Sequence, residues 1–156
     1  MSPQLPTHLP TPSPAEIATA QRTLYANGLS VRRAVVSDPY VDRSLANTTP
    51  FSAPLQEYVT GSAWGWVWSR PGLERKQRSL LNIAMLCALN RPVELGTHVR
   101  GAVRNGASEI EIRETLLQVA VYCGMPAAVE GFRITEGVLK EMKSNGEMEE
   151  TSGDVD

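Results

Sequence analysis

The residue pair best suited to proton chemistry is Glu94 and His98, which lie four residues apart in a segment with helical periodicity. His98 is one of two histidines, and the other, His8, lies in a proline-rich N-terminal stretch. Side chains at this spacing stack on one face of a helix, where a carboxylate orients an imidazole and raises its pKa. His98 would then hold a transferable proton near neutral pH. The same spacing is typical of a solvent-exposed pair, and taken alone it favours that simpler role.

Arginines form the second set of candidates, because the planar guanidinium group binds a carboxylate through two hydrogen bonds. Arg70 follows a tryptophan cluster in an expected loop, where binding residues are often found. Each arginine taken singly is also consistent with a solvated surface role. The candidates in the central part of the chain are Arg43, Arg70, Arg78, Arg91 and Arg100.

Aromatic residues are concentrated in one place, where Trp64, Trp66 and Trp68 occur within five residues. On a helix Trp64 and Trp68 share one face, while Trp66 points away. Such residues suit a hydrophobic core or subunit interface, or alternatively a pocket wall that stacks on a ring. Tyr122 and Cys123 fall at an expected helix end, where a hydroxyl or thiol could point into a cavity. A packed helix terminus is the simpler interpretation of that pair.

The elements that must position these residues are all helical, because every periodic segment has the helical period and none alternates like a strand. Capping boxes predict helices that begin after Ser13 and Ser108, and Gly28 is expected to end the first helix. The sequence predicts helices at about 14–27, 29–36, 40–46, 52–68, 73–89, 93–104, 109–122 and 126–143. We therefore expect one compact all-α domain of six to eight helices over residues 15–143. A proline-rich tail (1–14) and an acidic tail (144–156) are expected to be disordered.

The composition bounds the class of partner. Residues 1–143 contain 15 basic and 12 acidic groups, a mild excess that suits a small anionic molecule but not a nucleic acid. No apolar run approaches the roughly 20 residues of a membrane span, and the N-terminus has no apolar signal-peptide core. Cys87 and Cys123 lie in apolar helical patterns and are expected to be buried, reduced thiols. These features predict a cytoplasmic protein with neither nucleic-acid nor membrane partners.

A family resemblance is carried by two adjacent runs, AWGWVWSRPGLERKQRSLLNIAML and LNRPVELGTHVRGAVRNGASEIEIRETLLQVAVYCGMPAA. These resemble the carboxymuconolactone decarboxylase family, and the upstream VRRAVVSDPYVDRSLAN is similar to the decarboxylases proper. The resemblance covers about residues 21–142. It implies an all-α homo-oligomer, a trimer or hexamer, with active sites between helices near subunit contacts. It also implies decarboxylation of a carboxylated butenolide to an enol lactone, with neither a metal nor an organic cofactor.

Peroxidase relatives within this family carry Cys-x-x-Cys followed four residues later by His. Here the corresponding positions are Arg91, Glu94 and His98. Thiol–disulfide chemistry has no local partner without the two cysteines, so we do not expect peroxidase activity.

The implied reaction sets three tasks for the site. Loss of CO2 from the γ-carbon of a butenolide leaves an electron pair that the conjugated lactone carbonyl can take up as a dienolate. A donor must stabilise this oxyanion, an acid must protonate the ring carbon, and cations must hold any remaining carboxylate. With the resemblance, we interpret His98 as the proton donor, Glu94 as its orienting partner and the arginines as anion-binding groups.

Three positions depart from the family pattern. Trp66 stands where the decarboxylases proper commonly carry Glu, Val129 stands for Asn, and Arg133 stands for His. Arg133 adds a candidate carboxylate clamp but cannot donate a proton at working pH. These changes favour a rival, in which the enzyme isomerises, dehydrates or cyclises a related ring acid or polyketide-derived lactone of secondary metabolism rather than aromatic catabolism. A third hypothesis is a non-catalytic helical oligomer that binds an aromatic ligand.

Overall fold

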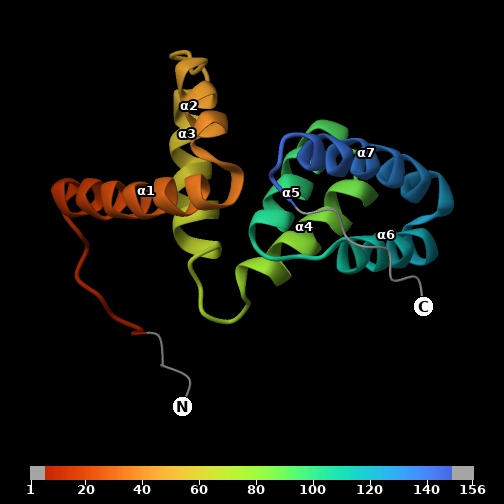
Figure 1. The fold of residues 1–156 in the computed structure, drawn as a ribbon. Helices are drawn as coiled ribbons and strands as arrows, with labels where there is room; N and C mark the ends of the chain where they lie inside the picture. The colour runs from red at the N-terminus through yellow and green to blue at the C-terminus, as the bar shows by residue number, and fades with distance from the viewer. Residues whose placement is uncertain (1–5, 149–156) are drawn as a thin grey trace.

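The computed structural model describes residues 6–148, which form seven α-helices and one π-helix with no strand among them (Figure 1). The all-α expectation is confirmed. The elements in chain order are α1 (Pro14–Val36), α2 (Asp38–Ala46), α3 (Ala53–Tyr58), η1 (Val59–Val67), α4 (Arg75–Ala88), α5 (Pro92–Arg104), α6 (Glu109–Cys123) and α7 (Met125–Ser144).

The predicted capping boxes are confirmed at α1 and α6. The hydroxyl of Ser13 accepts a hydrogen bond from the Glu16 backbone N–H, and the Glu16 carboxylate accepts one from the Ser13 N–H at 2.8 Å. Ser108 and Glu111 make the same reciprocal pair at the start of α6. These bonds satisfy N–H groups that have no partner within the helix, which explains why both helices begin where the sequence predicted.

The predicted end of the first helix at Gly28 is wrong, because α1 continues through this glycine to Val36. Gly28 is instead the point where α1 crosses η1. A methyl group in its place would lie 1.8 Å from the Thr60 carbonyl oxygen and 2.7 Å from the Gly65 nitrogen. Glycine is therefore required here for close approach between two helices, and not for a turn.

The single helix predicted over 52–68 is divided into a short α3 and the π-helix η1. The wider hydrogen-bond ring is seen where the Trp68 N–H donates to the Ala63 carbonyl, five residues back, at 2.9 Å. The residue types of this segment do not distinguish a π-helix from an α-helix, so the sequence could not predict the division. Short π-helices are frequently found at functional sites.

The described chain has two hydrophobic clusters. The first lies among α4, α5, α6 and α7 and includes Ile83, Leu95 and Leu116, all buried. The second lies where α1 and α2 pack on η1, and it includes Val35, Trp64 and Trp68. Figure 1 shows the corresponding division, with α1, α2 and α3 on one side and α4 to α7 on the other.

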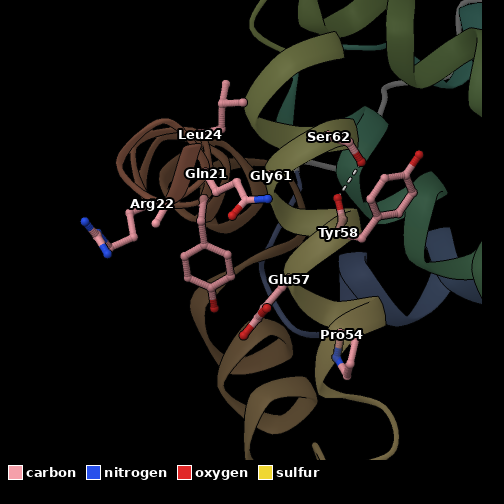
Figure 2. Close-up of a pocket in the computed structure, with 10 residues that line it drawn as sticks. Gln21, Arg22, Leu24, Pro54, Glu57, Tyr58, Gly61 and Ser62 are labelled. Atoms are coloured by element: carbon pink, nitrogen blue, oxygen red, sulfur yellow. Dashed lines mark hydrogen bonds between the residues drawn. The ribbon is translucent and has the colours of Figure 1, made fainter. Parts of the chain in front are cut away.

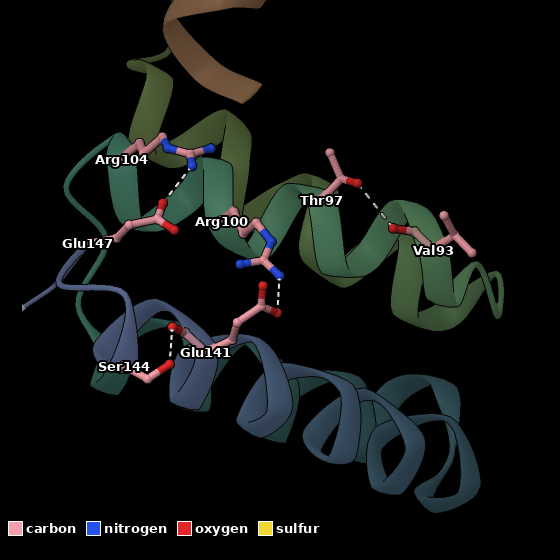
Figure 3. Close-up of polar contacts among 7 residues, drawn as sticks. All are labelled: Val93, Thr97, Arg100, Arg104, Glu141, Ser144 and Glu147. Atoms are coloured by element: carbon pink, nitrogen blue, oxygen red, sulfur yellow. Dashed lines mark hydrogen bonds and ion pairs between the residues drawn. The ribbon is translucent and has the colours of Figure 1, made fainter. Parts of the chain in front are cut away.

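Helix α5 joins the two clusters. Gly101 in α5 is packed so closely on α1 that an added methyl group would lie 3.1 Å from Val35 Cγ1, and Arg104 donates to the Val36 carbonyl at 3.3 Å. Figure 3 shows the opposite side of α5, where Arg100 pairs with Glu141 of α7 at 2.5 Å. The residues of α5 that face η1 are therefore fixed from both sides.

Parts of the two predicted tails, residues 1–5 and 149–156, lie outside the described residues. Within the described range, residues 6–13 form neither helix nor strand, and α7 ends at Ser144 as expected for the domain boundary. None of the helices in residues 6–148 has the length and apolar character needed to cross a bilayer.

Candidate active site

His98 lies where the two hydrophobic clusters meet. Its imidazole plane is within 4° of the Trp64 indole plane, with ring centroids 6.2 Å apart, and its centroid is 6.3 Å from that of Trp68. The two indoles stack on each other at 4.8 Å, and both are buried. Trp64 and Trp68 thus form an indole wall beside His98, at distances typical of offset aromatic stacking.

Helix α1 determines where the indole wall lies, because η1 packs closely against it. Gly65, the residue after Trp64, approaches α1 so closely that a methyl group there would lie 2.1 Å from the Leu24 carbonyl oxygen. Asn27 of α1 donates to the Gly65 carbonyl and to the Ser69 hydroxyl, each at 2.9 Å. The N-terminal helix is therefore part of what positions the ring environment of His98.

Asn82 of α4 contacts His98 from the other side. The Asn82 side-chain nitrogen lies 3.4 Å from His98 Nδ1, a long hydrogen bond in a partly buried position. The other ring nitrogen, Nε2, has no hydrogen-bond partner among residues 6–148 and is absent from the buried unpartnered atoms found there. Nε2 is therefore the ring nitrogen without a protein partner among these residues.

The pKa of His98 is lowered from its ordinary value, mainly because burial disfavours the charged imidazolium. The charge of Glu94 acts in the opposite direction but is the smaller influence. The predicted rise in the His98 pKa is therefore wrong, because the spacing of two residues on a helix carries no information about desolvation by η1. In the free protein at neutral pH the ring is mainly neutral.

The predicted orienting role of Glu94 is not supported by a hydrogen bond. Glu94 is exposed, and among the described residues His98 has Asn82 as its hydrogen-bond partner. The sequence analysis missed Asn82. The feature that could have pointed to Asn82 is its position within the apolar run LLNIAML. Asn has a low helix propensity, so its presence there suggests a specific contact.

Arg78 is the candidate arginine that lies on α4, the helix that carries Asn82. It precedes Asn82 by one helical turn on the same face of α4, and its Nη2 donates to the Arg70 carbonyl at 2.9 Å. The Nε of Arg78 is buried with no partner among residues 6–148. A guanidinium with an unused buried donor can accept a carboxylate as its partner. Arg70 is exposed and contributes its carbonyl.

Two further candidate arginines, Arg100 and Arg133, already have carboxylate partners. Arg100 pairs with Glu141, and Arg133 makes two hydrogen bonds to Glu130 of the same helix at 2.5 and 2.8 Å. Arg133 is exposed, and the pKa of its guanidinium is raised chiefly by the hydrogen bonds to Glu130. The structure does not bring either group to His98.

Tyr122 and Cys123 are both exposed and line an apolar groove of about 800 Å³ between α4 and α6. Met85 and Leu81 also line this groove, which contains none of the residues around His98. The expectation that Cys123 is buried is wrong, because α6 ends there and exposes its last turn. Cys87 is buried as predicted, and its thiol donates to the Ala127 carbonyl at 3.2 Å.

A second groove, of about 950 Å³, lies between α1 and the α3–η1 segment (Figure 2). Arg22, Glu57 and Tyr58 line it, and the Ser62 hydroxyl donates to the Tyr58 carbonyl beside it. The sequence analysis did not predict this groove, and none of the candidate site residues belongs to it. Within residues 6–148, no cluster of three or more His, Cys, Asp or Glu side chains is arranged so that it could bind a metal ion.

Comparison with known proteins agrees with the resemblance found in the sequence. The profile described as "Carboxymuconolactone decarboxylase family" matches residues 53–137. This chain is a member of that family. The matched segment contains the indole wall, Arg78, Asn82 and His98, so that the whole candidate site lies within the shared region.

Two family members illustrate its range. The chain is 47% identical over 126 residues to the nitrosuccinic acid decarboxylase of Metarhizium robertsii, covering 81% of this chain and 88% of that protein. It is 42% identical over 118 residues to the 4-carboxymuconolactone decarboxylase of Acinetobacter baylyi, covering 76% and 88% respectively.

The three departures from the family pattern lie on the surface of the chain. Trp66 is 57% exposed, Val129 is 68% exposed, and Arg133 is engaged with Glu130. Trp66 points away from the indole wall, as the spacing predicted. Among the described residues, none of these three side chains has a hydrogen bond, ion pair or ring contact with His98.

Proposed function

We propose that this chain is a cofactor-free decarboxylase of a small dicarboxylic acid, with His98 as proton donor and Arg78 as anion-binding group. The observation that carries the proposal is His98 itself, whose ring stacks beside a buried indole wall and whose Nε2 has no protein partner among the described residues. An uncharged aromatic surface next to an ionisable ring suits a reaction that loses a charged group and needs one proton.

The substrate class follows from chemistry common to the two named acids. Each of these acids carries a second carboxylate, and each has an electron acceptor for the pair left by CO2. In 4-carboxymuconolactone the acceptor is the conjugated lactone carbonyl, which gives a dienolate. In nitrosuccinic acid it is the nitro group, which gives a nitronate when CO2 leaves the carbon that bears it.

The proposed step balances as follows. The bond between the carboxylate carbon and the substrate carbon breaks, CO2 departs, and the electron pair passes to oxygen of the lactone or nitro group. Nε2–H of the His98 imidazolium then protonates carbon, and the ring becomes neutral. The reaction consumes one proton from solvent, which re-forms the imidazolium once the next substrate has bound.

The neutral resting state of His98 fits this sequence if the substrate brings negative charge. A nearby dianion raises the pKa of an imidazole, because the positive ring is then stabilised by opposite charge. Arg78 would hold the carboxylate that stays on the substrate, through its Nε, which has no protein partner among the described residues. Proton uptake would therefore accompany binding.

Between the two substrates, we favour the nitro-acid class over the carboxylated butenolide of the sequence analysis, because identity is higher to the Metarhizium robertsii protein. The rival reactions, isomerisation, dehydration or cyclisation, rested on Trp66, Val129 and Arg133, and these lie on the surface of the chain. The predicted homo-oligomer stays a prediction.

The test is CO2 release from nitrosuccinic acid and from 4-carboxymuconolactone, each followed with purified protein. Turnover of either acid supports the proposal, and turnover of nitrosuccinic acid alone selects its substrate class. His98→Gln should lower the rate by about 10²-fold or more, as expected for loss of a general acid. Binding of both acids without CO2 release would instead favour the non-catalytic oligomer.

A further inference from the structure

We propose that Asn82 is the positioning residue of this site, and that its amide directs the reactive proton to Nε2 of His98. The inference rests on the proposed function for its catalytic consequence. Its structural content, which ring nitrogen carries the proton, can be measured without any substrate.

The geometry gives Asn82 a specific task. Its side-chain nitrogen faces His98 Nδ1 at 3.4 Å, across the contact between α4 and α5. An amide N–H can donate only to a ring nitrogen that carries no proton, so the neutral imidazole must have its hydrogen on Nε2. Nε2 is also the nitrogen left open among the described residues.

An amide is suited to a ring that changes charge during the reaction. When His98 becomes protonated, Nδ1 carries hydrogen and needs an acceptor, which the Asn82 side-chain oxygen supplies after rotation of the amide. Asp could only accept, which favours the charged ring or the neutral ring protonated at Nδ1, and Leu would hold neither form. Asn82 can therefore engage Nδ1 in both states while Nε2 stays directed at the substrate.

The charged groups around His98 are few. Glu94 lies on its own helix, and Arg78 lies one turn before Asn82 on α4. The π-helix η1, which supplies the indole wall, contains no ionisable residue. From α1, the residues packed against α5 are Val35 and Val36. Asn82 is thus the polar side chain in hydrogen-bond contact with the ring.

The experiment compares Asn82→Leu with a matched control, Asn105→Leu. Asn105 is also a partly buried amide between α5 and α4, and it donates to the Ser79 hydroxyl at 2.9 Å without touching His98. Both variants therefore lose one interhelical amide hydrogen bond. The readout is ¹⁵N NMR of the histidine rings above the pKa of His98, with the second histidine, His8, as an internal reference.

In the unmodified protein and in Asn105→Leu, His98 should show two well-separated nitrogen signals, which report a single tautomer protonated at Nε2. In Asn82→Leu the signals should move together as the tautomers mix, and kcat should fall at least about tenfold with little change in KM. Asn82→Asp should keep the ring oriented and move the kcat/KM pH profile to higher pH, because a carboxylate stabilises the imidazolium.

An unchanged His98 tautomer in Asn82→Leu overturns the proposal, as does an equal loss in Asn105→Leu. If the unmodified protein decarboxylates neither acid, the proposed function fails on that result alone. The tautomer signals then decide the role of Asn82 independently.

Discussion

The imidazole of His98 and the indole of Trp64 lie nearly parallel, although His98 belongs to α5 and Trp64 to η1, two elements that α4 separates along the chain. The contact places an ionisable group against a buried, uncharged surface. Burial is the main reason that the pKa of His98 is lowered. The same contact therefore links the packing of η1 on α1 to the protonation of the site.

Replacing Trp64 with Leu should raise the pKa of His98 toward its ordinary value, because water then reaches the ring. The substitution also removes a buried aromatic side chain and should lower the free energy of unfolding by about 2 kcal/mol or more. NMR titration of His98 and urea unfolding measure the two effects. Trp66→Leu, at an exposed neighbour, should leave the His98 pKa unchanged and alter stability by about 0.5 kcal/mol or less.

The stability of the protein should depend on pH through His98. Its pKa is lowered in the folded state, so the unfolded chain, with an ordinary pKa of about 6.5, binds more protons as the pH falls below that value. The His98 contribution to stability is therefore present at pH 7 and is lost as the pH falls toward the folded-state pKa. Urea unfolding at pH 7 and pH 5 should show a smaller pH-dependent loss for His98→Gln than for the unmodified protein. An equal loss in both proteins would contradict the burial of the ring.

The rate should also depend on the protonation of His98, with the fall at different pH values for the free and the substrate-bound protein. Because kcat/KM reports the free protein, it should fall as the pH rises through the lowered pKa of His98, which removes the imidazolium. The fall in kcat should occur at higher pH, because the bound anion raises that pKa. Coinciding profiles for kcat and kcat/KM would contradict proton uptake on binding.

The sequence predicted most of the fold because its signals are local. Capping boxes at Ser13 and Ser108, and the proline at position 92 that begins α5, act within one turn of the helix ends that they determine. These signals do not depend on what packs against the helix. They were confirmed for that reason.

Contacts between distant segments were the part that could not be predicted. Gly28 has the same local signal whether it ends a helix or lies at a crossing, and only the proximity of Thr60 decides between the two. The pKa of His98 was predicted in the wrong direction because Glu94 is near in sequence, whereas Trp64 and Asn82 are near only in space. The family resemblance favoured a role for His98 but gave no indication of its amide partner Asn82.

Arg78 should contribute to substrate binding through its unpartnered Nε. Arg78→Gln should raise KM by about tenfold or more for a dicarboxylic substrate, because a charge-assisted bidentate contact is lost. Arg78→Lys keeps the charge without the planar fork and should recover only part of the affinity. The matched control is Arg113→Gln, an exposed arginine paired with its neighbour Glu114. If both glutamine variants raise KM equally, Arg78 has no specific role.

The crossing of α1 and η1 can be tested with two alanine substitutions that have opposite expected effects. Gly28→Ala places a methyl group 1.8 Å from the Thr60 carbonyl oxygen, a backbone atom that cannot move aside cheaply, and should lower the free energy of unfolding by about 3 kcal/mol. Gly137→Ala, inside α7 with no atom within 4 Å of the added methyl group, should instead raise stability by about 0.5–1 kcal/mol.

Measurements of activity show whether Gly28→Ala disturbs only the crossing of α1 and η1 or also the surroundings of His98. Because Gly28 packs on the nitrogen of Gly65, next to Trp64, any shift that relieves the clash must move the indole wall relative to His98. Gly28→Ala should therefore lower kcat/KM and raise the pKa of His98 even at temperatures where the variant is fully folded. Gly137→Ala should leave both quantities unchanged. A folded Gly28→Ala protein with normal activity and an unchanged His98 pKa would show that α1 does not determine the position of the indole wall.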